Sequence, residues 1–568
     1  MIDPSRLGPS QRRIALERLV DERFDVAVIG GGSTGTGAAL DAASRGLSVA
    51  LVEQRDIASG TSSRSSKLIH GGLRYLEHLD FGLVREALRE RGLLLTKLAP
   101  HLVYPVPFVY PFRNRLWERA YVGAGVGIYD AMAATGANPL PRQRQLSHRS
   151  LLNLMPGLDP DAFVGGLRYY DGGTDDARVV TALARTAGRE GAVVATSVRV
   201  LRIPRDRDRV VGIVAVDLES GRELRVQADV VINATGVWTD GVERLVEDPV
   251  RDVTASKGIH LVVPGNRIEA SAGLITRTAH SVLFVIPFHG NWLVGTTDTP
   301  WDLDLAHPAA SADDIDYVLA EVNQLLARPL GRSDIRGVYA GLRPLVTGGK
   351  GPTTQLSREH AISRPAPGML TIAGGKLTTY RVMAKDVVDA AVRERGVAAG
   401  NSRTADLPLV GAEDWTNLWA GRGRLATDTG FTLPMIEHLL RRHGSNIGDL
   451  LDLIAARPEL GRRLDPEAPY LKAEVVWAVE SEGALHLDDI LARRTRLSIE
   501  VKDRGVKAAP EAARLVAPVL GWDEATVARE VEHYTLRVAA EIESQTQPSD
   551  HTADAARMGA PDVRTMGH

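Results

Sequence analysis

A run of closely spaced glycines near the N-terminus, residues 30–37, restricts the possible folds more than any other feature of the sequence. An apolar run at 24–29 precedes it, small residues typical of a closely packed helix follow as far as Arg45, and a second apolar run ends at Glu53. This order of strand, glycine turn, helix, strand and acidic residue is typical of a β-α-β unit that binds a dinucleotide. We therefore predict an α/β chain that begins with a Rossmann-like domain.

Each glycine of the turn has a separate physical role in such a site. Gly30 permits the tight turn, Gly32 lets the backbone approach a pyrophosphate, and Gly35 lets the helix pack closely against the strand. The N-terminus of the helix offers N–H groups and partial positive charge to phosphate, and Glu53 can accept hydrogen bonds from ribose hydroxyls. The alternative interpretation is a glycine-rich turn without a ligand.

The sequence contains this pattern once, which is compatible with either FAD or NAD. A later group of glycines, Gly123, Gly125 and Gly127, has the wrong spacing for a second site. The segment at 59–67 is dense in hydroxyl groups and is followed by His70 and two glycines. Such a loop offers hydrogen-bond donors to a pyrophosphate and to flavin edges, so we predict FAD. Composition alone also fits a flexible surface linker at this position.

The composition excludes several kinds of chemistry. The chain has 568 residues, 44% of them hydrophobic, and a formal net charge of −3, which argues against a dedicated nucleic-acid-binding protein. It has no cysteine, which excludes disulfides, thiolate catalysis and iron–sulfur clusters, and we find no metal-ligand motif. The N-terminus lacks a signal-peptide core, and no long apolar run predicts a transmembrane helix. We expect a cytoplasmic protein, soluble or bound to a membrane surface.

Changes in pattern along the chain divide it into two discontinuous domains, a helical domain and a tail. Short strands at 281–287 and 291–295 indicate an antiparallel sheet, and amphipathic segments from about residue 409 onward indicate an all-α domain. The predicted units are a FAD-binding domain at 24–101, 171–248 and 365–391, a substrate-binding domain at 102–170 and 249–364, a helical C-terminal domain at 409–543, and a disordered tail at 544–568.

Two groups of basic residues outside the glycine turn have more than one interpretation. Arg493, Arg494 and Arg496 favour a solvated helix face over a binding patch. Basic and aromatic residues at 113–121 precede an apolar stretch at 122–129. That pattern suits either a bilayer interface or a helix of the substrate-binding domain.

Several separated motifs, in the same order along the chain, are similar to those of the FAD-dependent glycerol-3-phosphate dehydrogenases. The glycine turn within residues 29–46 resembles the first signature of that family, and residues 374–384 resemble the second. Shorter stretches similar to the family lie between the signatures, at 65–77, 233–236, 257–260, 295–298 and 341–345. The resemblance extends from about residue 24 to beyond residue 384, and more loosely through the C-terminal third.

The resemblance implies a FAD-binding fold of the glutathione-reductase and D-amino-acid-oxidase type. It implies oxidation of sn-glycerol 3-phosphate to dihydroxyacetone phosphate by hydride transfer to flavin N5, with electrons passed to the membrane quinone pool. A peripheral position on the inner face of the cell membrane, through monotopic contact, follows from that electron acceptor. The alternatives are a glycerol-3-phosphate oxidase that uses O2, an amine or amino-acid oxidase of the same fold, and a flavin-binding sensor without turnover. A homodimer is one of the oligomeric states that the sequence leaves open.

The same resemblance implies which residues act on the substrate. Arg343 and Arg74 are expected at the phosphate, with Tyr75 nearby, and Lys376 at the substrate, the flavin or both. Arginine suits phosphate because its planar guanidinium can donate two parallel hydrogen bonds. His260 is the predicted base for the proton of the C2 hydroxyl, since an imidazole titrates near neutral pH, and the alternative is a structural histidine in a strand. The predicted catalytic residues are His260, Arg343 and Lys376.

A larger set of residues is expected at the cofactor. Reduced flavin develops negative charge, which the N-terminus of a helix after Gly375 would stabilise. By resemblance, the turn at 233–236 lies near the diphosphate and Val198 lies near the adenine. The predicted cofactor-binding residues are Gly30, Gly32, Ser33, Thr34, Gly35, Glu53, Thr61, Ser62, Ser66, Lys67, Leu68, His70, Gly72, Val198, Ala234, Thr235, Gly236, Gly375, Lys376, Leu377 and Thr378.

Overall fold

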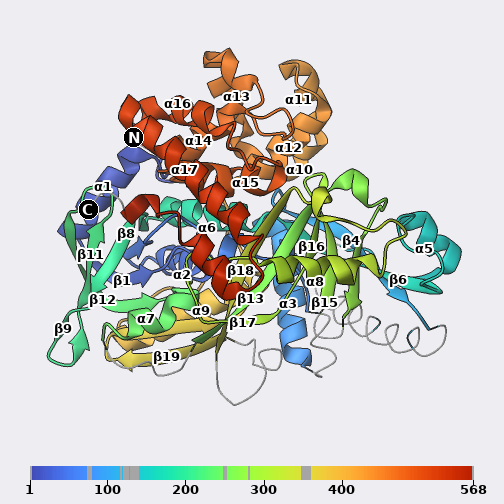
Figure 1. Cartoon of the computed structure of the whole chain (residues 1–568). Coiled ribbons are helices and arrows are strands. Elements are labelled where there is room, and N and C mark those ends of the chain that lie inside the picture. The colour runs from blue at the N-terminus through green and yellow to red at the C-terminus, as the bar shows by residue number, and fades with distance from the viewer. Residues whose placement is uncertain are drawn as a thin grey trace.

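The computed structural model describes residues 3–72, 80–114, 118, 127, 140–246, 253–278, 282–346 and 360–565. Figure 1 shows two sheets side by side beneath a layer of C-terminal helices. The fold class predicted from the sequence, an α/β FAD-binding fold with a largely antiparallel second sheet and an all-α C-terminal region, is confirmed. The predicted membrane patch at 113–121 lies largely outside the described residues.

The first sheet has eight strands and is parallel at its centre, where β1 pairs with β2 and β12. Its main path runs in the order β19-β20-β12-β1-β2-β7, and β8 and β11 join it beside β12. Central strands of a parallel sheet are covered on both faces, which is why they read as continuous apolar runs. The strands are β1 (Arg23–Ile29), β2 (Val49–Val52), β7 (Val193–Ala195), β8 (Val198–Arg202), β11 (Gly212–Asp217), β12 (Glu223–Asn233), β19 (His360–Ala366) and β20 (Met369–Gly374).

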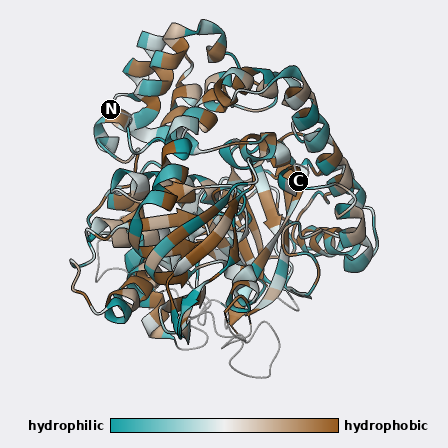
Figure 2. Ribbon diagram, turned by 90° about the vertical axis from the view of Figure 1, so that its left-hand side faces the viewer, coloured by the Kyte–Doolittle hydropathy of each residue, from teal (hydrophilic) through white to brown (hydrophobic). Residues whose placement is uncertain are grey.

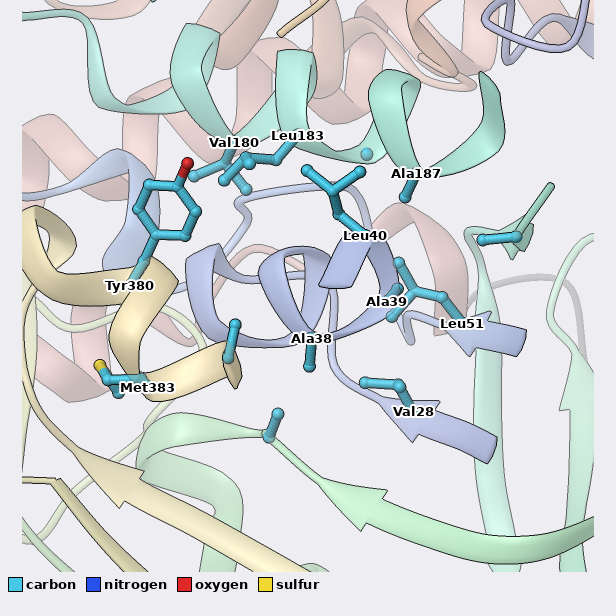
Figure 3. Close-up of a cluster of buried hydrophobic side chains, with 14 of the residues drawn as sticks. Val28, Ala38, Ala39, Leu40, Leu51, Val180, Leu183, Ala187, Tyr380 and Met383 are labelled. Carbon is cyan, nitrogen blue, oxygen red and sulfur yellow. The ribbon is translucent and has the colours of Figure 1, made fainter. Parts of the chain in front are cut away.

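Helix α2 (Ser33–Ser44) packs between the parallel strands and two further helices, α6 (Asp176–Arg189) and α9 (Tyr380–Arg395), as Figure 3 shows. Neighbours on several sides leave room only for small side chains on α2. A Cβ atom on Gly35 would lie 1.9 Å from the carbonyl oxygen of Gly30. The helix therefore approaches the glycine turn as closely as the sequence pattern predicts.

The second sheet has ten strands and is antiparallel except where β14 pairs with β4. Figure 2 shows hydrophobic residues concentrated on the strands in the middle of the molecule. The strands predicted at 281–287 and 291–295 are present as β15 and β16. The strands are β3 (Leu68–Ile69), β4 (Val103–Phe112), β5 (Arg144–Ser147), β6 (Gly165–Thr174), β13 (Val253–Pro264), β14 (Gly273–Arg277), β15 (Val282–Phe288), β16 (Asn291–Gly295), β17 (Thr299–Trp301) and β18 (Gly337–Val346).

Helices account for nearly all regular structure after residue 400. Two apolar clusters form their interior, one around Trp477 and one around Tyr534. The helices are α10 (Trp415–Ala420), α11 (Arg422–Thr429), α12 (Leu433–His443), α13 (Ile447–Ala456), α14 (Lys472–Glu482), the π-helix η11 (Asp489–Arg494), α15 (Leu497–Glu500), α16 (Ala509–Leu520), α17 (Glu524–Ser544) and α18 (Asp550–Arg557). Among the described residues, no helix is long and apolar enough to cross a membrane.

The prediction of a disordered tail at 544–568 is wrong for the described part of that segment. The tail forms α18, which Ser549 caps and whose Ala553 is fully buried in a cluster with Trp301 of β17. Farther along, Arg564 is buried and forms an ion pair of 2.8 Å with Asp489. A polar composition suggested disorder, but the partners of these polar groups lie in remote parts of the chain.

The interpretation of Arg493, Arg494 and Arg496 as a solvated face is also wrong. All three are buried at the junction between the C-terminal helices and the first sheet. Arg493 and Arg494 lie 2.6 Å and 2.7 Å from carboxylate oxygens of Asp56, and Arg496 lies 2.6 Å from Asp176. Buried charges need such partners, and the sequence gives no local sign of a partner more than three hundred residues away.

The division of the chain at residues 101, 171, 248, 365 and 391 stays a prediction. Two strands lie across its boundaries. β3 pairs with β6 of the second sheet although residues 24–101 are assigned to the FAD-binding domain. β19 begins at His360 in the first sheet, five residues before the predicted boundary at 365.

Candidate active site

A cavity of about 410 Å³ opens at the carboxyl ends of strands β1, β12 and β20. Its lining begins at Ile29, where β1 ends, and includes the turn after β12 and residues 372–377 after β20. Ligands of open α/β sheets bind outside the carboxyl ends of the strands. This position therefore agrees with the dinucleotide site that the glycine turn predicts.

The glycine turn leaves its backbone open toward this cavity. Gly30 has a φ of +113°, and a Cβ there would lie 2.7 Å from the carbonyl oxygen of Ala234. Gly32, the N-cap residue of helix α2, has no side chain that could cap the helix. The positive end of the helix dipole is thus available to an anion.

The hydroxyl-rich loop at 59–67 is anchored on both sides, so its interpretation as a flexible linker does not hold. Ser62 Oγ accepts a hydrogen bond of 3.0 Å from the backbone N–H of Ser33, at the start of α2. Thr61 Oγ1 donates one of 2.6 Å to the carbonyl oxygen of Leu342 in β18. The loop therefore connects the glycine turn to the second sheet along the wall of the cavity.

The acidic end of β2 also faces the cavity. Glu53 accepts hydrogen bonds from the backbone N–H groups of Gly31, at 2.6 Å, and Arg55, at 2.8 Å. Burial raises the pKa of Glu53, because a low-dielectric environment disfavours the charged carboxylate. The carboxyl group is therefore held in place beside the glycine turn, where a ribose hydroxyl would meet it.

Two thirds of the predicted cofactor-binding residues line the cavity. These are Gly30, Gly32, Ser33, Thr34, Glu53, Thr61, Ser62, Val198, Ala234, Thr235, Gly236, Gly375, Lys376 and Leu377. The glycine turn, the helix N-terminus, the acid and the mixed polar and apolar walls fit the phosphates, ribose and rings of FAD.

The remaining predicted cofactor residues lie outside this lining. Gly35 serves the packing of α2, and Gly72 has a φ of +78° in the turn after β3. Thr378 Oγ1 donates to the carbonyl oxygen of His70 at 3.2 Å, which joins the two family motifs. The others are Ser66, which contacts His260, Lys67, which forms a buried ion pair of 2.8 Å with Asp176, and Leu68, which is buried in β3.

Sequence reasoning missed several lining residues, including Arg199, Trp238 and Met383. Arg199 follows the predicted Val198 in β8, and Trp238 comes shortly after the predicted turn at 233–236, so proximity along the chain could have indicated both. Met383 lies inside helix α9, and only the tertiary structure brings it to the cavity.

Arg343 is held in place by a glycine on the neighbouring strand. Arg343 pairs with Ser256, Gly258 lies two residues farther along β13, and a Cβ on Gly258 would lie 2.5 Å from Arg343 Nη2. The guanidinium donates to Thr296 Oγ1 at 3.1 Å and forms an ion pair of 3.4 Å with Asp298. The motifs at 257–260, 295–298 and 341–345 therefore meet around one arginine.

His260 lies on β13, directly opposite Tyr339 of β18. The two rings stack with centroids 5.0 Å apart, and Nε2 lies 2.9 Å from Ser66 Oγ. Nδ1 is buried and has no hydrogen-bond partner among the described residues. Burial lowers the pKa of His260 well below its ordinary value, and the positive charges of Arg343 and Lys67 lower it further. The imidazole is therefore neutral near pH 7 and can accept a proton.

The other predicted substrate residues are only partly placed. Lys376 lines the flavin cavity, as does Pro344, the residue after Arg343. Arg74 and Tyr75 lie outside the described residues. Within the parts of the chain that the structure describes, no group of three or more potential metal ligands gathers.

Comparison with protein families places these features in a known class. Residues 25–381 match the family described as FAD dependent oxidoreductase, and residues 402–527 match the C-terminal domain of alpha-glycerophosphate oxidase. The first match covers more than half of the chain. Fold, cavity and family match together define an FAD-dependent oxidoreductase.

Individual relatives narrow the class further. Glycerol-3-phosphate dehydrogenase 2 of Mycobacterium tuberculosis (strain ATCC 25618 / H37Rv) is 53% identical over 559 residues, which cover 98% of this chain and 95% of that protein. The mitochondrial glycerol-3-phosphate dehydrogenase of Homo sapiens is 39% identical, over 92% of this chain and 74% of its own length. The structure of the glycerol-3-phosphate dehydrogenase from Bacillus halodurans complexed with FAD superposes with a TM-score of 0.77 at 28% identity, covering 94% of this chain and 98% of that one. The chain belongs to the FAD-dependent glycerol-3-phosphate dehydrogenase family.

Proposed function

We propose that this chain oxidises sn-glycerol 3-phosphate to dihydroxyacetone phosphate and passes the electrons to a membrane quinone. The observation that carries the proposal is the arrangement of His260 and Arg343 on neighbouring strands. Arg343 precedes Pro344 of the flavin cavity, and His260 contacts Ser66, which follows Ser65 of the same cavity. Relatives that bear the name glycerol-3-phosphate dehydrogenase over nearly the whole chain support the choice of substrate.

The residues of this chain supply a proton acceptor and cations. When bound, FAD accepts the hydride from carbon C2 of the substrate. His260 Nε2 donates its proton to Ser66 Oγ in the tautomer that leaves the Nδ1 lone pair free. Nδ1 then takes the proton of the C2 hydroxyl. Loss of a hydride and a proton converts the alcohol to the ketone.

Arg343 and Arg74 are the cations assigned by resemblance to the phosphate end of the substrate, with Tyr75 nearby. Lys376 is assigned to the substrate, the flavin or both. A guanidinium held by Thr296 and Asp298 has its orientation set before the substrate arrives. Two such cations attract a phosphate dianion more strongly than they attract a single carboxylate. This charge favours a phosphorylated polyol over the amino-acid substrates of the alternative oxidases.

Anaerobic mixing of the purified holoenzyme with sn-glycerol 3-phosphate tests the reaction directly. We expect loss of the oxidised-flavin absorbance with this substrate and none with lactate or an amino acid as controls. Addition of a quinone or of O2 to the reduced enzyme then separates the dehydrogenase from the oxidase. A flavoprotein that glycerol 3-phosphate fails to bleach would contradict the assignment of the substrate.

The role of His260 has its own test. His260→Asn is expected to lower kcat by about 10²–10⁴-fold, as loss of a general base does, with FAD retained. Because its pKa is depressed, kcat/KM of the unsubstituted enzyme should not fall at the ordinary histidine value of about 6.5. The profile is corrected for the phosphate of the substrate, which titrates near about pH 6. A fall centred on the ordinary value that His260→Asn abolishes would show that the base is not held neutral.

The peripheral position on the inner face of the cell membrane belongs to the same proposal. A quinone is lipid-soluble, so an enzyme that reduces it must meet the bilayer surface. Co-sedimentation of the holoenzyme with anionic vesicles that contain a quinone measures this contact. An enzyme that remains in the supernatant and reduces only soluble acceptors would contradict it.

A further inference from the structure

A second cavity, of about 100 Å³, lies where the C-terminal helices meet the second sheet. Figure 1 shows the red C-terminal segment reaching down to β18. Ser63 and Arg64 line this cavity, while Ser62 and Ser65 line the flavin cavity, so one loop separates the two. A cavity of this volume can hold a small polyatomic ligand.

Positive charge dominates the walls of this cavity. Six arginines contribute to its lining, and Asp488 and Glu541 are the two acidic residues that do so. The arginines are Arg64, Arg493, Arg496, Arg504, Arg537 and Arg557. They belong to five different segments of the chain, which meet at this cavity.

Two of the six arginines are neutralised by carboxylates behind the wall. Arg493 forms ion pairs with Asp56 and Asp489, as well as with Asp488. Arg496 forms ion pairs with Asp175 and Asp176. These two side chains therefore add little net charge to the cavity.

Among the described residues, Glu541 is the one carboxylate within ion-pair distance of the other four arginines. The charge of Asp488, which pairs with Arg493, also acts on this group. Arg504 and Arg557 both form ion pairs with Glu541, Arg557 at 3.1 Å. Among the described residues, no carboxylate lies within ion-pair distance of Arg64 or Arg537. Burial and neighbouring positive charges lower the pKa of Arg64 to about 9 and that of Arg557 to about 10. The cavity thus has a surplus of cations.

Arg537 also has more donors than its neighbours can accept. It is 8% exposed, and its Nε has no hydrogen-bond partner among the described residues. Its Nη1 and Nη2 each lie 2.9 Å from a ring nitrogen of His307. Burial and the charge of Arg537 lower the pKa of His307 to about 3, and a neutral imidazole has only one acceptor nitrogen. At least two N–H groups of this guanidinium therefore lack an acceptor.

We infer that this cavity is a binding site for a small oxyanion, namely phosphate or the phosphoryl group of an organic phosphate. Buried guanidinium donors in excess of acceptors are costly unless an anion satisfies them. Tetrahedral oxyanions offer several acceptor oxygens to guanidinium forks. The bound anion would contact Arg64, in the loop whose neighbouring residues line the flavin cavity.

Calorimetric titration of the holoenzyme with inorganic phosphate tests this site. The Arg343→Gln background removes one of the cations assigned to the substrate phosphate and so weakens binding at the substrate site, which lets binding to the new site be measured separately. We expect one phosphate per chain in this background. Adding Arg537→Gln should weaken binding by about tenfold to a hundredfold, the effect of losing charged hydrogen bonds. Adding Arg529→Gln, on the same helix α17 but exposed, should not change it.

The same titration with sn-glycerol 3-phosphate identifies the source of the anion. Binding of both ligands supports a general phosphate site, and binding of the ester alone supports an organic phosphate. Equal affinity in the Arg537→Gln and Arg529→Gln variants, or no binding of either ligand in the Arg343→Gln background, would overturn the inference.

Hydrogen exchange of the unsubstituted holoenzyme gives a test that does not depend on the folding of a variant. Saturating phosphate should slow amide exchange in segments 488–504 and 534–557, because ligand contacts suppress local opening. Protection confined to the strands that carry Arg343, with unchanged exchange in those segments, would overturn the inference as well.

Discussion

The flavin-binding sheet and the junction with the C-terminal helices are both buried, but different kinds of side chain hold them together. In the sheet, Val28, Leu51 and Ile232 are fully buried against other apolar groups, and glycines bring the backbones close. At the junction, buried arginines meet buried carboxylates, as Arg494 meets Asp56. The two regions therefore depend on different contributions to stability.

This difference explains which part of the molecule can be recognised from the sequence. Apolar packing appears as local periodicity, since every neighbour along a strand or helix face takes part in it. A buried ion pair needs only one residue from each of two distant segments. The arginines of η11 consequently look like surface residues until their partners are known.

Removing the charge of one buried carboxylate at the junction should give the largest loss of stability. Asp56→Asn keeps the side-chain shape but leaves Glu482, at 3.9 Å, as the nearest carboxylate to Arg494 among the described residues. Removing one partner of a buried ion pair costs about 3–5 kcal/mol, measured as the free energy of unfolding in urea. Asp428→Asn is the matched control, since its ion pair with Arg424 is exposed and contributes less than about 1 kcal/mol. Equal losses in the two variants would show that the junction does not depend on its ion pairs.

A change in the flavin-binding sheet should have a smaller effect on stability but a direct one on the cofactor. Gly35→Ala places a Cβ 1.9 Å from the carbonyl oxygen of Gly30, so the glycine turn must shift. We expect a loss of about 1–3 kcal/mol, as in other overpacked sites, together with lower FAD content measured from the absorbance of the purified protein. Gly241→Ala is the control, because Gly241 lines the flavin cavity and a Cβ there would meet no atom within 4 Å. Normal FAD content in the Gly35 variant would show that close packing of α2 is dispensable.

A third expected effect is a dependence of stability on pH that arises at the junction. His486 lies between Glu219 and Glu530, with nitrogen–oxygen distances of 3.1 Å and 2.8 Å. Burial and the charge of Arg564 lower its pKa, but hydrogen bonds to the two glutamates outweigh them and raise it to about 9. Its contribution is complete below the unfolded value of about 6.5 and is lost as the pH rises through about 9.

His486→Gln should therefore remove the decline in unfolding free energy between these two pH values. The slope of that decline corresponds to the release of at most one proton. Leu51→Ala in the sheet should lower the whole stability curve without altering its shape, since no titrating group is involved. A decline that persists unchanged in His486→Gln would assign the alkaline loss of stability to other groups.

Much of the flavin site could be predicted because its residues follow one another at fixed spacing. The glycines, the helix N-terminus and Glu53 lie within a single β-α-β unit, whose geometry depends on local backbone constraints. The positions of Ser66 and Lys67 were harder to predict. Both carry donors suited to a cofactor, yet the structure turns them toward His260 and Asp176.

The sequence by itself determined the dinucleotide-binding fold, the family and the motifs that carry His260 and Arg343. Glycine spacing and apolar runs specify local backbone conformation, and that information survives without knowledge of distant contacts. Only the tertiary structure decided that the C-terminal arginines are buried, that the tail is ordered through Arg564, and that two cavities lie on either side of one loop. Charge partners and cavities depend on which remote segments meet, and a chain read residue by residue does not contain that information in any local pattern.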